Sequence, residues 1–242
     1  MKKNFCIVGG TASEACVAAL TERGYQVIVL PENSALPYPV SMHADMSVHI
    51  IGRSIFLYRD YYETNRSLFD DLCDRASLSI TICSGDFGAK YPSDIRLNFF
   101  KVGKYFVGRT DKCADELLKR AVRGGLEPLF CRQGYARCSA CVVKNCVITQ
   151  DKSLYKVLQK QHIESLLIEP GHVRLEGYGN GYEGFIGGAS GYDEHIHTLY
   201  FTGKVSALPR YEKILSLCNL YDVNIVELTQ DELHDCGSLI FF

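Results

Sequence analysis

The chain has 242 residues, of which 47% are hydrophobic, 11% aromatic and 22% charged. This composition is typical of a globular protein with a real core and excludes a disordered or fibrous chain. Lys and Arg number 26 against 28 Asp and Glu, a formal net charge of −2, so the totals disfavour a nucleic-acid-binding protein.

A short apolar strand followed by a helical pattern recurs five times along the chain. The starts of these strands lie roughly 50 residues apart, close to one fifth of the chain, which indicates an internal repeat. The strands are predicted at residues 5–8, 55–58, 105–108, 146–149 and 199–202. Apolar residues at helical spacing after each strand predict a helix there, as for Leu68, Phe69, Leu72 and Cys73.

Each repeat has two further strands. An apolar run precedes the strand across a short polar turn, which predicts β-hairpins that begin at residues 48–51, 97–102 and 140–143. A third strand closes each unit, at residues 25–30, 78–82, 126–131, 163–168 and 223–228. Helix starts are predicted from a capping box at Thr11 and Glu14 and from caps at Asp111 and Asp151.

The fifth unit is split between the two ends of the chain. Its first strand is predicted within residues 235–242, and residues 4–32 supply the rest. Pairing of the last strand with the first would close a ring, so we expect a single domain over residues 1–242. The predicted fold class is α/β: a five-bladed α/β propeller of strand, strand, helix, strand units.

The amino end has a second interpretation. A strand, Gly9-Gly10, a helix and a second strand followed by Glu32 resemble the opening of a nucleotide-binding domain. The third glycine of that fingerprint is absent, and a doubly wound parallel sheet has no use for the extra hairpin strands. This interpretation stays open as a Rossmann-like alternative.

In a propeller of this kind the openings of the first strands converge on one central cavity. Those openings carry several acidic residues together with a histidine and a cysteine, which predicts a pocket for a cationic ligand with a nucleophile in it. The candidate residues are His43, Asp45, Asp94, Cys138, Glu183 and Asp235.

Here the sequence resembles the pentein superfamily of guanidino-group-modifying enzymes, most closely the motif pattern of agmatine deiminases. His43-Ala44-Asp45 opens one unit as the family's His-x-Asp does, and Asn98 begins an aromatic strand in the next. The family's cysteine two units after the histidine corresponds to Cys138, and Asp235 stands where the family has Glu in Glu-Gly-Gly-Ser. The chain departs from the family at residues 184–190, and its repeats are circularly shifted. An uncharacterised bacterial family of this fold would match equally well.

The resemblance implies a cysteine-dependent hydrolase or amidinotransferase acting on a small guanidino or amidino compound. Cys138 would attack the central carbon, His43 would protonate the leaving amine, and Asp45 would orient His43. Asp94, Glu183 and Asp235 would bind the guanidinium, since carboxylates match its fork of N–H donors. The resemblance adds Asn98 to these substrate-binding residues. It implies an enzyme that uses no metal and no cofactor.

Plain alternatives exist for the same residues. Cys138 is one of eleven cysteines and could be core packing, and Cys236 competes with it as a nucleophile. The spacing Cys138-x-x-Cys141 invites a metal site, but on a strand it sends the two sulfurs to opposite faces. A non-catalytic binding protein of the same fold is therefore the main functional alternative.

The location of the protein follows from weaker signals. The first apolar run is too short for the core of a signal peptide, and no stretch has the roughly 18 apolar residues of a membrane helix. An odd number of scattered cysteines favours reduced, buried thiols. We expect a cytoplasmic protein without membrane partners.

The Gly- and Tyr-rich residues 176–192 predict a lid or a long hairpin loop, and His195 and His197 are expected on one face of a strand.

Overall fold

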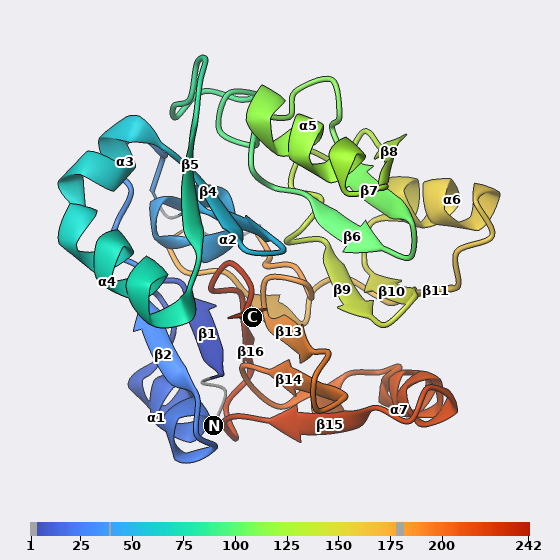
Figure 1. Ribbon diagram of the computed structural model, residues 1–242. Helices are drawn as coiled ribbons and strands as arrows, with labels where there is room; N and C mark the ends of the chain where they lie inside the picture. The colour runs from blue at the N-terminus through green and yellow to red at the C-terminus, as the bar shows by residue number, and fades with distance from the viewer. Residues whose placement is uncertain (1–3, 39, 178–181) are drawn as a thin grey trace.

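The computed structural model describes residues 4–38, 40–177 and 182–242 (Figure 1). Within them the strands form five three-stranded sheets and one two-stranded pair. The three-stranded sheets are β17 (Ile240–Phe241), β1 (Phe5–Val8) and β2 (Gln26–Val29); β3 (His49–Ile51), β4 (Ser54–Tyr58) and β5 (Ser79–Cys83); β6 (Phe100–Val102), β7 (Tyr105–Gly108) and β8 (Glu127–Phe130); β9 (Ala140–Val143), β10 (Cys146–Thr149) and β11 (Ser165–Leu167); and β13 (Ser190–Asp193), β14 (Thr198–Phe201) and β15 (Asn224–Glu227).

All five sheets have the same topology. The central strand pairs antiparallel with its hairpin partner and parallel with the strand that follows the helix. Helices occupy the connections to the parallel strands, as a parallel crossover requires. They are α1 (Glu14–Glu22), α3 (Arg59–Thr64), α4 (Arg66–Ala76), α5 (Asp115–Arg123), α6 (Lys152–Lys160) and α7 (Tyr211–Leu220).

Three short elements and one strand pair lie outside this scheme. A short helix, α2 (Ala44–Ser47), leads into β3, and single 3-10 turns occupy Val40–Met42 and Val205–Ala207. Strand β12 (Val173–Arg174) pairs in parallel with β16 (Leu233–His234). This pair ties the loop before β13 to the segment before β17.

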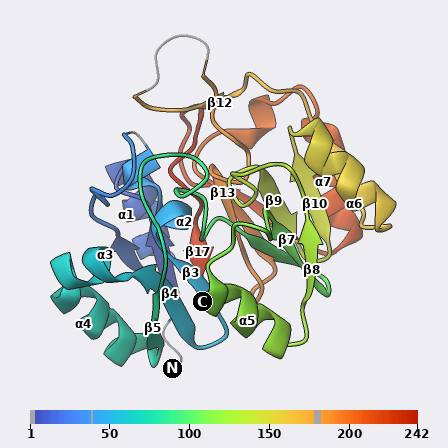
Figure 2. The ribbon, with the colours of Figure 1, turned by 90° about the horizontal axis from the view of Figure 1, so that it is seen from above.

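The five sheets lie around a common centre, close to which the chain ends (Figure 1). Seen from above, β17 runs between β3 and β13 (Figure 2). The predicted pairing of the two ends is confirmed, because Cys6 faces Phe241 and Ile7 faces Ile240 in an antiparallel register. The rings of Phe5 and Phe242 stack with centroids 5.6 Å apart.

The central strands are buried along their length, apart from the first residue of β4 and of β7. Hydrophobic clusters join neighbouring sheets: Phe56 of β4 packs with Phe106 of β7 and Leu117 of α5, and Ile148 of β10 packs with Phe201 of β14. Burial of each such side chain contributes about 1.5–3 kcal/mol. This explains why the sequence shows these strands as continuous apolar runs.

The predicted central and third strands are confirmed to within two residues at either end, whereas two of the first strands are shorter than predicted. Strand β6 begins at Phe100 and β17 at Ile240, not at residues 97 and 235. The residues before β17 bond to other strands instead: Asp235 N donates to Arg174 O of β12, and Leu239 N donates to Ser190 O of β13. These openings are therefore loops that reach across the centre.

Several local predictions were wrong. Ser13, not Thr11, caps α1 by accepting from Cys16 N, and α5 begins after Ala114 without a cap from Asp111. Residues 194–197, which include His195 and His197, form the turn between β13 and β14 instead of a strand face. Of the Gly- and Tyr-rich segment, residues 178–181 lie outside the described residues.

The described sheets have two or three strands each, so they do not form the extended parallel sheet of a nucleotide-binding domain. The described helices include none long and apolar enough to cross a membrane.

The close approach of three segments explains the glycine after β1. A Cβ on Gly9 would lie 2.1 Å from Cys236 O and 2.4 Å from Met42 O, both of them backbone atoms. Gly9 thus lets the end of β1, the turn before His43 and the segment after Asp235 pack together.

Gly9→Ala is expected to destabilise the protein by about 1–3 kcal/mol or more, because the methyl group overlaps two backbone carbonyls. Chemical denaturation measures the loss. Gly88→Ala is the control, since a Cβ there meets only Ala35 O, at 3.9 Å. Equal stability of the two variants would contradict the packing described.

Candidate active site

Candidate residues from four of the five predicted openings meet at the centre of the molecule. His43 precedes α2 and Asp45 lies within it, while Asn98 comes before β6, Cys138 before β9 and Asp235 after β16. The backbone joins two of them directly, because Asp45 N donates to Gly237 O at 3.0 Å. Residues nearly two hundred positions apart in sequence thus become neighbours.

The thiol of Cys138 faces the carboxylate of Asp45. Cys138 Sγ lies 3.0 Å from Asp45 Oδ2 and 3.2 Å from Oδ1, so the thiol donates to the carboxylate. Ser238 Oγ donates to the same Oδ2 at 2.7 Å. Asp45 and Cys138 are 2% and 3% exposed, respectively.

Asn98 holds the backbone on which the thiol sits. Its Oδ1 accepts from Arg137 N at 2.8 Å, and its Nδ2 donates to Cys138 Sγ at 3.2 Å and to Asp45 O at 3.3 Å. The side chain is fully buried, so a change that left these groups unpaired would cost about 1–3 kcal/mol for each. Asn98 therefore fixes the thiol relative to Asp45.

Asp235 anchors a second loop and reaches the imidazole. Its Oδ2 accepts from Phe185 N at 2.9 Å and its Oδ1 from Gly237 N at 3.0 Å. His43 Nδ1 lies 3.6 Å from Asp235 Oδ1. Gly188 allows this arrangement, because a Cβ there would lie 1.9 Å from the same carboxylate oxygen.

Burial governs the protonation of these groups. It raises the pKa of Asp235 from 3.8 to about 6 and raises that of Asp45. Burial lowers the pKa of His43 below 6.5. The pKa of Cys138 is raised well above 9.0, by burial first and then by the negative charges of Asp45 and Asp235. The thiol form of Cys138 is thus favoured at neutral pH.

Asp94 lies at the edge of this cluster. Its Oδ2 accepts from Tyr135 OH at 2.8 Å, and the next residue, Ile95, packs in the same apolar cluster as Cys138. Two polar atoms of the predicted site are buried without a hydrogen-bond partner among the described residues: Asp94 Oδ1 and His43 Nδ1. Such atoms are costly unless a ligand or water satisfies them.

Other candidates lie elsewhere. Glu183 is exposed, and its carboxylate lies beside Gly171, outside the cluster. Cys236 packs into the core with Cys6 and Cys16. All eleven cysteines are buried free thiols.

Cys141 belongs to a different hydrophobic cluster from Cys138, so the two sulfurs do not form a pair of ligands. A different set has the chemistry of a metal site: one donor atom each of His43, Asp45 and Cys138 lies within 4.8 Å of the others. These donor types suit Zn²⁺. Without a metal ion, the thiol of Cys138 keeps its proton and donates it in a hydrogen bond to Asp45.

An apolar layer covers the thiol. Leu36, Val40, Met46 and Ile95 are buried around Cys138, and the partly buried Phe87, Tyr135 and Phe185 pack against them. A substrate must displace part of this layer to reach the sulfur, and loops rather than sheet strands carry most of these side chains.

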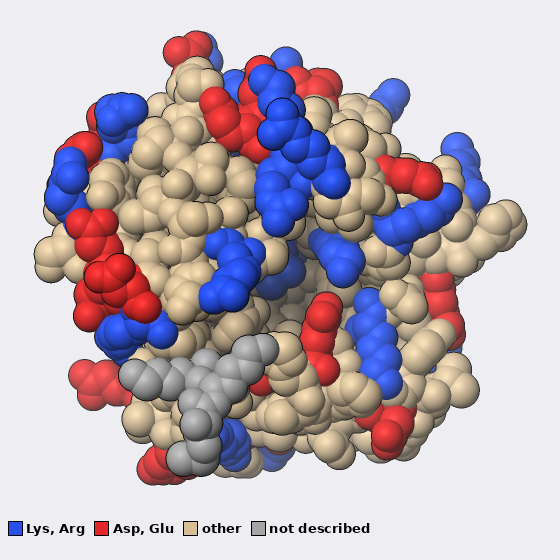
Figure 3. Space-filling view, in the orientation of Figure 1, with Lys and Arg blue, Asp and Glu red and all other residues tan. Residues whose placement is uncertain are grey.

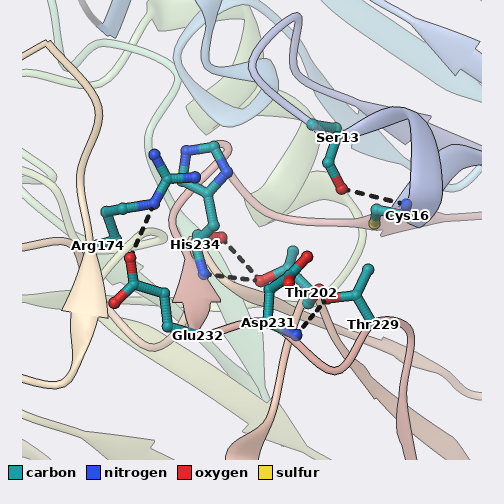
Figure 4. Close-up of a pocket in the computed structure, with 9 residues that line it drawn as sticks. Ser13, Cys16, Arg174, Thr202, Thr229, Asp231, Glu232 and His234 are labelled. Atoms are coloured by element: carbon teal, nitrogen blue, oxygen red, sulfur yellow. Dashed lines mark hydrogen bonds and ion pairs between the residues drawn. The ribbon is translucent and has the colours of Figure 1, made fainter.

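A polar pocket of about 400 Å³ lies beside the strand that leads to Asp235 (Figure 4). His234 on one wall binds Thr202 through its backbone, and Arg174 forms an ion pair with Glu232 at 3.2 Å. Ser13 at the start of α1 forms another wall. The pocket holds charges of both signs, and its size suits a small molecule.

Sequence reasoning missed three contributors to the site. Ser238 binds Asp45, Tyr135 binds Asp94, and Phe185 N binds Asp235. Ser238 stands at the serine position of the family's Glu-Gly-Gly-Ser motif when Asp235 is aligned with its Glu, so the motif was an available signal. Tyr135 and Phe185 lie in irregular loops without a comparable pattern.

Residues 7–240 match a family of unknown function, DUF6873. The chain belongs to this family. No functionally curated protein matches the sequence.

Solved structures resemble the DUF6873 chain over its full length. One is a dimethylarginine dimethylaminohydrolase in an adduct with S-methyl-L-thiocitrulline, 12% identical with a TM-score of 0.60, and another is DDAH from Pseudomonas aeruginosa complexed with citrulline, 10% identical with a TM-score of 0.54. Both comparisons cover 100% of each chain. SxtG, an amidinotransferase from Microseira wollei in the saxitoxin biosynthetic pathway, is 11% identical over 94% of this chain and 88% of its own, with a TM-score of 0.52.

At these identities the likeness shows the fold. The chain has a mixed α/β fold whose structural neighbours are pentein-fold guanidino-modifying enzymes, so the predicted resemblance to that superfamily is confirmed.

The raised pKa of Asp235 predicts a pH dependence of stability. Between about pH 4 and pH 6 the native carboxyl keeps a proton that the unfolded chain releases, so the free energy of unfolding falls as pH rises through this window. Asp235→Asn lacks this titration. The wild-type stability minus that of the variant should therefore fall by up to about 3 kcal/mol between pH 4 and pH 7.

Urea unfolding at successive pH values measures this difference. Asp86→Asn, at an exposed carboxylate, serves as the control for removal of a negative charge. A difference between wild type and Asp235→Asn that stays constant with pH would show that Asp235 ionises as it does in the unfolded chain.

Proposed function

We propose that this protein is a cysteine-dependent enzyme that hydrolyses, or transfers the amidino group of, a small guanidino or amidino compound. The observation that carries the proposal is the junction at Cys138, whose Sγ lies 3.0 Å from Asp45 Oδ2 and 3.2 Å from Asn98 Nδ2. The shared fold supports it: structures with this fold include a hydrolase and an amidinotransferase.

The substrate cation is bound by the buried acidic groups. Asp94 Oδ1 has no partner among the described residues, and Asp45 and Asp235 lie on either side of His43. A planar guanidinium offers five N–H donors, and two carboxylates bind it from fixed directions. Burial first, and then the negative charge of Asp235, raises the pKa of Asp45, and the positive charge of the guanidinium offsets that repulsion.

The reaction begins when the cation favours the thiolate of Cys138. The thiol proton passes to Asp45, and the sulfur forms a bond to the central carbon of the guanidinium. The proton passes on from Asp45 to His43, the bond from that carbon to the departing amine breaks, and His43 delivers the proton to the amine. The product of this half-reaction is a covalent thiouronium on Cys138 and a free amine.

The second half-reaction restores the enzyme. A water molecule loses a proton to His43 and attacks the same carbon, the carbon–sulfur bond breaks, and His43 returns that proton to the departing thiolate of Cys138. The other proton of the water molecule is released to solvent as the neutral product forms. The product of hydrolysis is a urea derivative, and citrulline bound to DDAH from Pseudomonas aeruginosa is a compound of this class. An amine in place of water would make the reaction an amidinotransfer.

We further propose that the five sheets are the blades of a closed α/β propeller and that residues 1–242 form one domain. Their common topology and the pairing of β1 with β17 support this arrangement. It accounts for the meeting of residues from four blades in one site.

The second candidate function is a non-catalytic binding protein of the same fold. The observation that favours it is the cover over the thiol: Cys138 is 3% exposed beneath an apolar layer. A binding protein needs no attack by the sulfur, so a test of covalent chemistry separates the two functions.

Turnover and labelling together test the proposed function. We expect ammonia, citrulline, urea or an amine to form from at least one of arginine, agmatine and the methylated arginines, and we expect 2-chloroacetamidine to label Cys138 selectively. Cys138→Ala should lower turnover by at least about a thousandfold, because the covalent path is lost. Mass spectrometry of the peptides locates the label.

Cys141→Ala is the matched control, since Cys141 is equally buried three residues away. Turnover should also be unaffected by chelators, which separates the thiol chemistry from a metal at His43, Asp45 and Cys138. Label spread over several cysteines with no turnover of any compound would support the binding protein.

The charges around the thiol predict how it discriminates between reagents. At pH 7 the cationic chloroacetamidine should modify Cys138 at least about tenfold faster than neutral chloroacetamide, after each rate is divided by that with free cysteine. Asp45→Asn removes both the cation's partner and the charge that raises the thiol pKa. It should therefore slow the cationic reagent and accelerate the neutral one.

Stopped-assay mass spectrometry measures both rates, with Asp86→Asn as the control. If Asp45→Asn slowed both reagents by the same factor, Asp45 would have only a structural role.

A further inference from the structure

A second cavity, of about 740 Å³, lies among the first strands of the sheets. Figure 3 shows Lys and Arg side chains gathered around a hollow in the middle of this face. Among the described residues, the side chains that cover Cys138 do not line the cavity, so it is separate from the covered side of the thiol. Asp45 and Arg137 lie at its inner end.

Four cationic side chains from different elements line this cavity. They are Arg53 in the β3–β4 turn, Lys101 on β6, Arg120 on α5 and Arg137 in the loop before β9. None of the four forms an ion pair with a carboxylate in the described part of the chain. Because the whole chain has a net charge of −2, this concentration of positive charge is local.

The acidic side chains on the described lining are fewer than these cations, and Asp45 attracts Arg137. Asp45 accepts from Cys138, and Asp193 accepts from Tyr25 OH at 2.6 Å. Glu194 is exposed and is the remaining acidic side chain on the described lining. Four cationic side chains thus face three acidic ones, which gives the side chains of the described lining a formal charge of +1. A low-dielectric concave site focuses such a field on an incoming anion.

The rest of the lining is largely apolar. Six aromatic residues belong to it: Phe99, Phe100, Phe106, Tyr192, Phe241 and Phe242. His49 also lines the cavity, and burial together with the charge of Arg137 lowers its pKa to about 4, so the ring is neutral at pH 7. The cavity thus offers aromatic rings to the apolar part of a ligand and cationic side chains to its negatively charged part.

The same charges make this cavity unsuitable as the path of a guanidinium substrate. A cation moving toward Asp45 from this side would pass Arg53, Lys101 and Arg120 and then meet Arg137. Like charges at these distances repel, most strongly where water is excluded. The group that these cations fit is therefore an anion, whereas the proposed substrate is bound through its guanidinium cation.

We propose that this cavity is a binding site for an organic anion that carries phosphate or carboxylate groups on an apolar body. Its oxyanions bind Arg53, Lys101, Arg120 and Arg137, and its body packs on the aromatic rings. Guanidinium groups bind such oxyanions in a bidentate manner, and three of the four cations are arginines.

Isothermal titration with three anions and one neutral compound tests the site. ATP and benzene-1,3,5-tricarboxylate both combine charge with an aromatic body, pyrophosphate has the charge alone and adenosine the body alone. We expect saturable 1:1 binding of ATP, of the tricarboxylate or of both, with pyrophosphate weaker and adenosine weakest. Which of the two aromatic anions binds better distinguishes a phosphate from a carboxylate ligand.

Arg120→Gln and Lys101→Gln should each weaken the binding of the better anion about tenfold or more. Lys119→Gln is the matched control, because Lys119 lies on the same helix, is exposed and does not line the cavity. Glu194→Gln should leave affinity unchanged or raise it. Thermal denaturation of each variant tests whether it is folded. If Arg120→Gln or Lys101→Gln does not fold, Arg53→Gln is measured in its place.

Absence of saturable binding of all three anions up to about 1 mM would overturn the proposal. So would equal weakening by Arg120→Gln and Lys119→Gln, or binding of adenosine as tight as that of ATP. The titrations are repeated with Cys138→Ala, in which anion binding should persist, so a failed catalytic proposal and a failed anion site give different results.

Discussion

The hydrogen bond from Cys138 to Asp45 is the contact on which the centre of this protein depends. It joins loops from two sheets, and through Ser238 and Asn98 the same two residues bind two more. A carboxylate this deeply buried is stable only when its partners are fixed, because an unpaired one would cost several kcal/mol. The glycines at positions 9, 188 and 237 permit the close packing that fixes them.

The repeat could be predicted from the sequence because the central strand of every unit is buried and therefore apolar. Each central strand is enclosed by a helix and neighbouring sheets, so it appears as an apolar run of four or five residues, and the starts were predicted within one residue. The loops before the first strands obey no such pattern. Their conformations depend on bonds between distant segments, such as Asp235 N to Arg174 O, and no local signal encodes these bonds.

The residues of the candidate site could be predicted where the repeat or the family motif gives their position. His43, Asp45, Cys138 and Asp235 were chosen by their position in the repeat and Asn98 by the family resemblance, and the fold brings them together. Glu183 was also chosen by its position in the repeat, but it is exposed and lies outside the cluster. The fourth unit has a long irregular segment before β13, so a position in its sequence does not predict a position at the centre. The apolar cover over the thiol and the second cavity were invisible in the sequence, since each draws on many separate elements.

The central claim is that acidic groups present a bound amidinium to the sulfur of Cys138. A crystal structure of the protein after reaction with 2-chloroacetamidine tests it most directly. The account predicts a covalent bond to Cys138 Sγ, with the amidinium nitrogens within hydrogen-bond distance of at least two of Asp45, Asp94 and Asp235. An adduct on another cysteine, or one on Cys138 whose nitrogens touch none of these carboxylates, would contradict it.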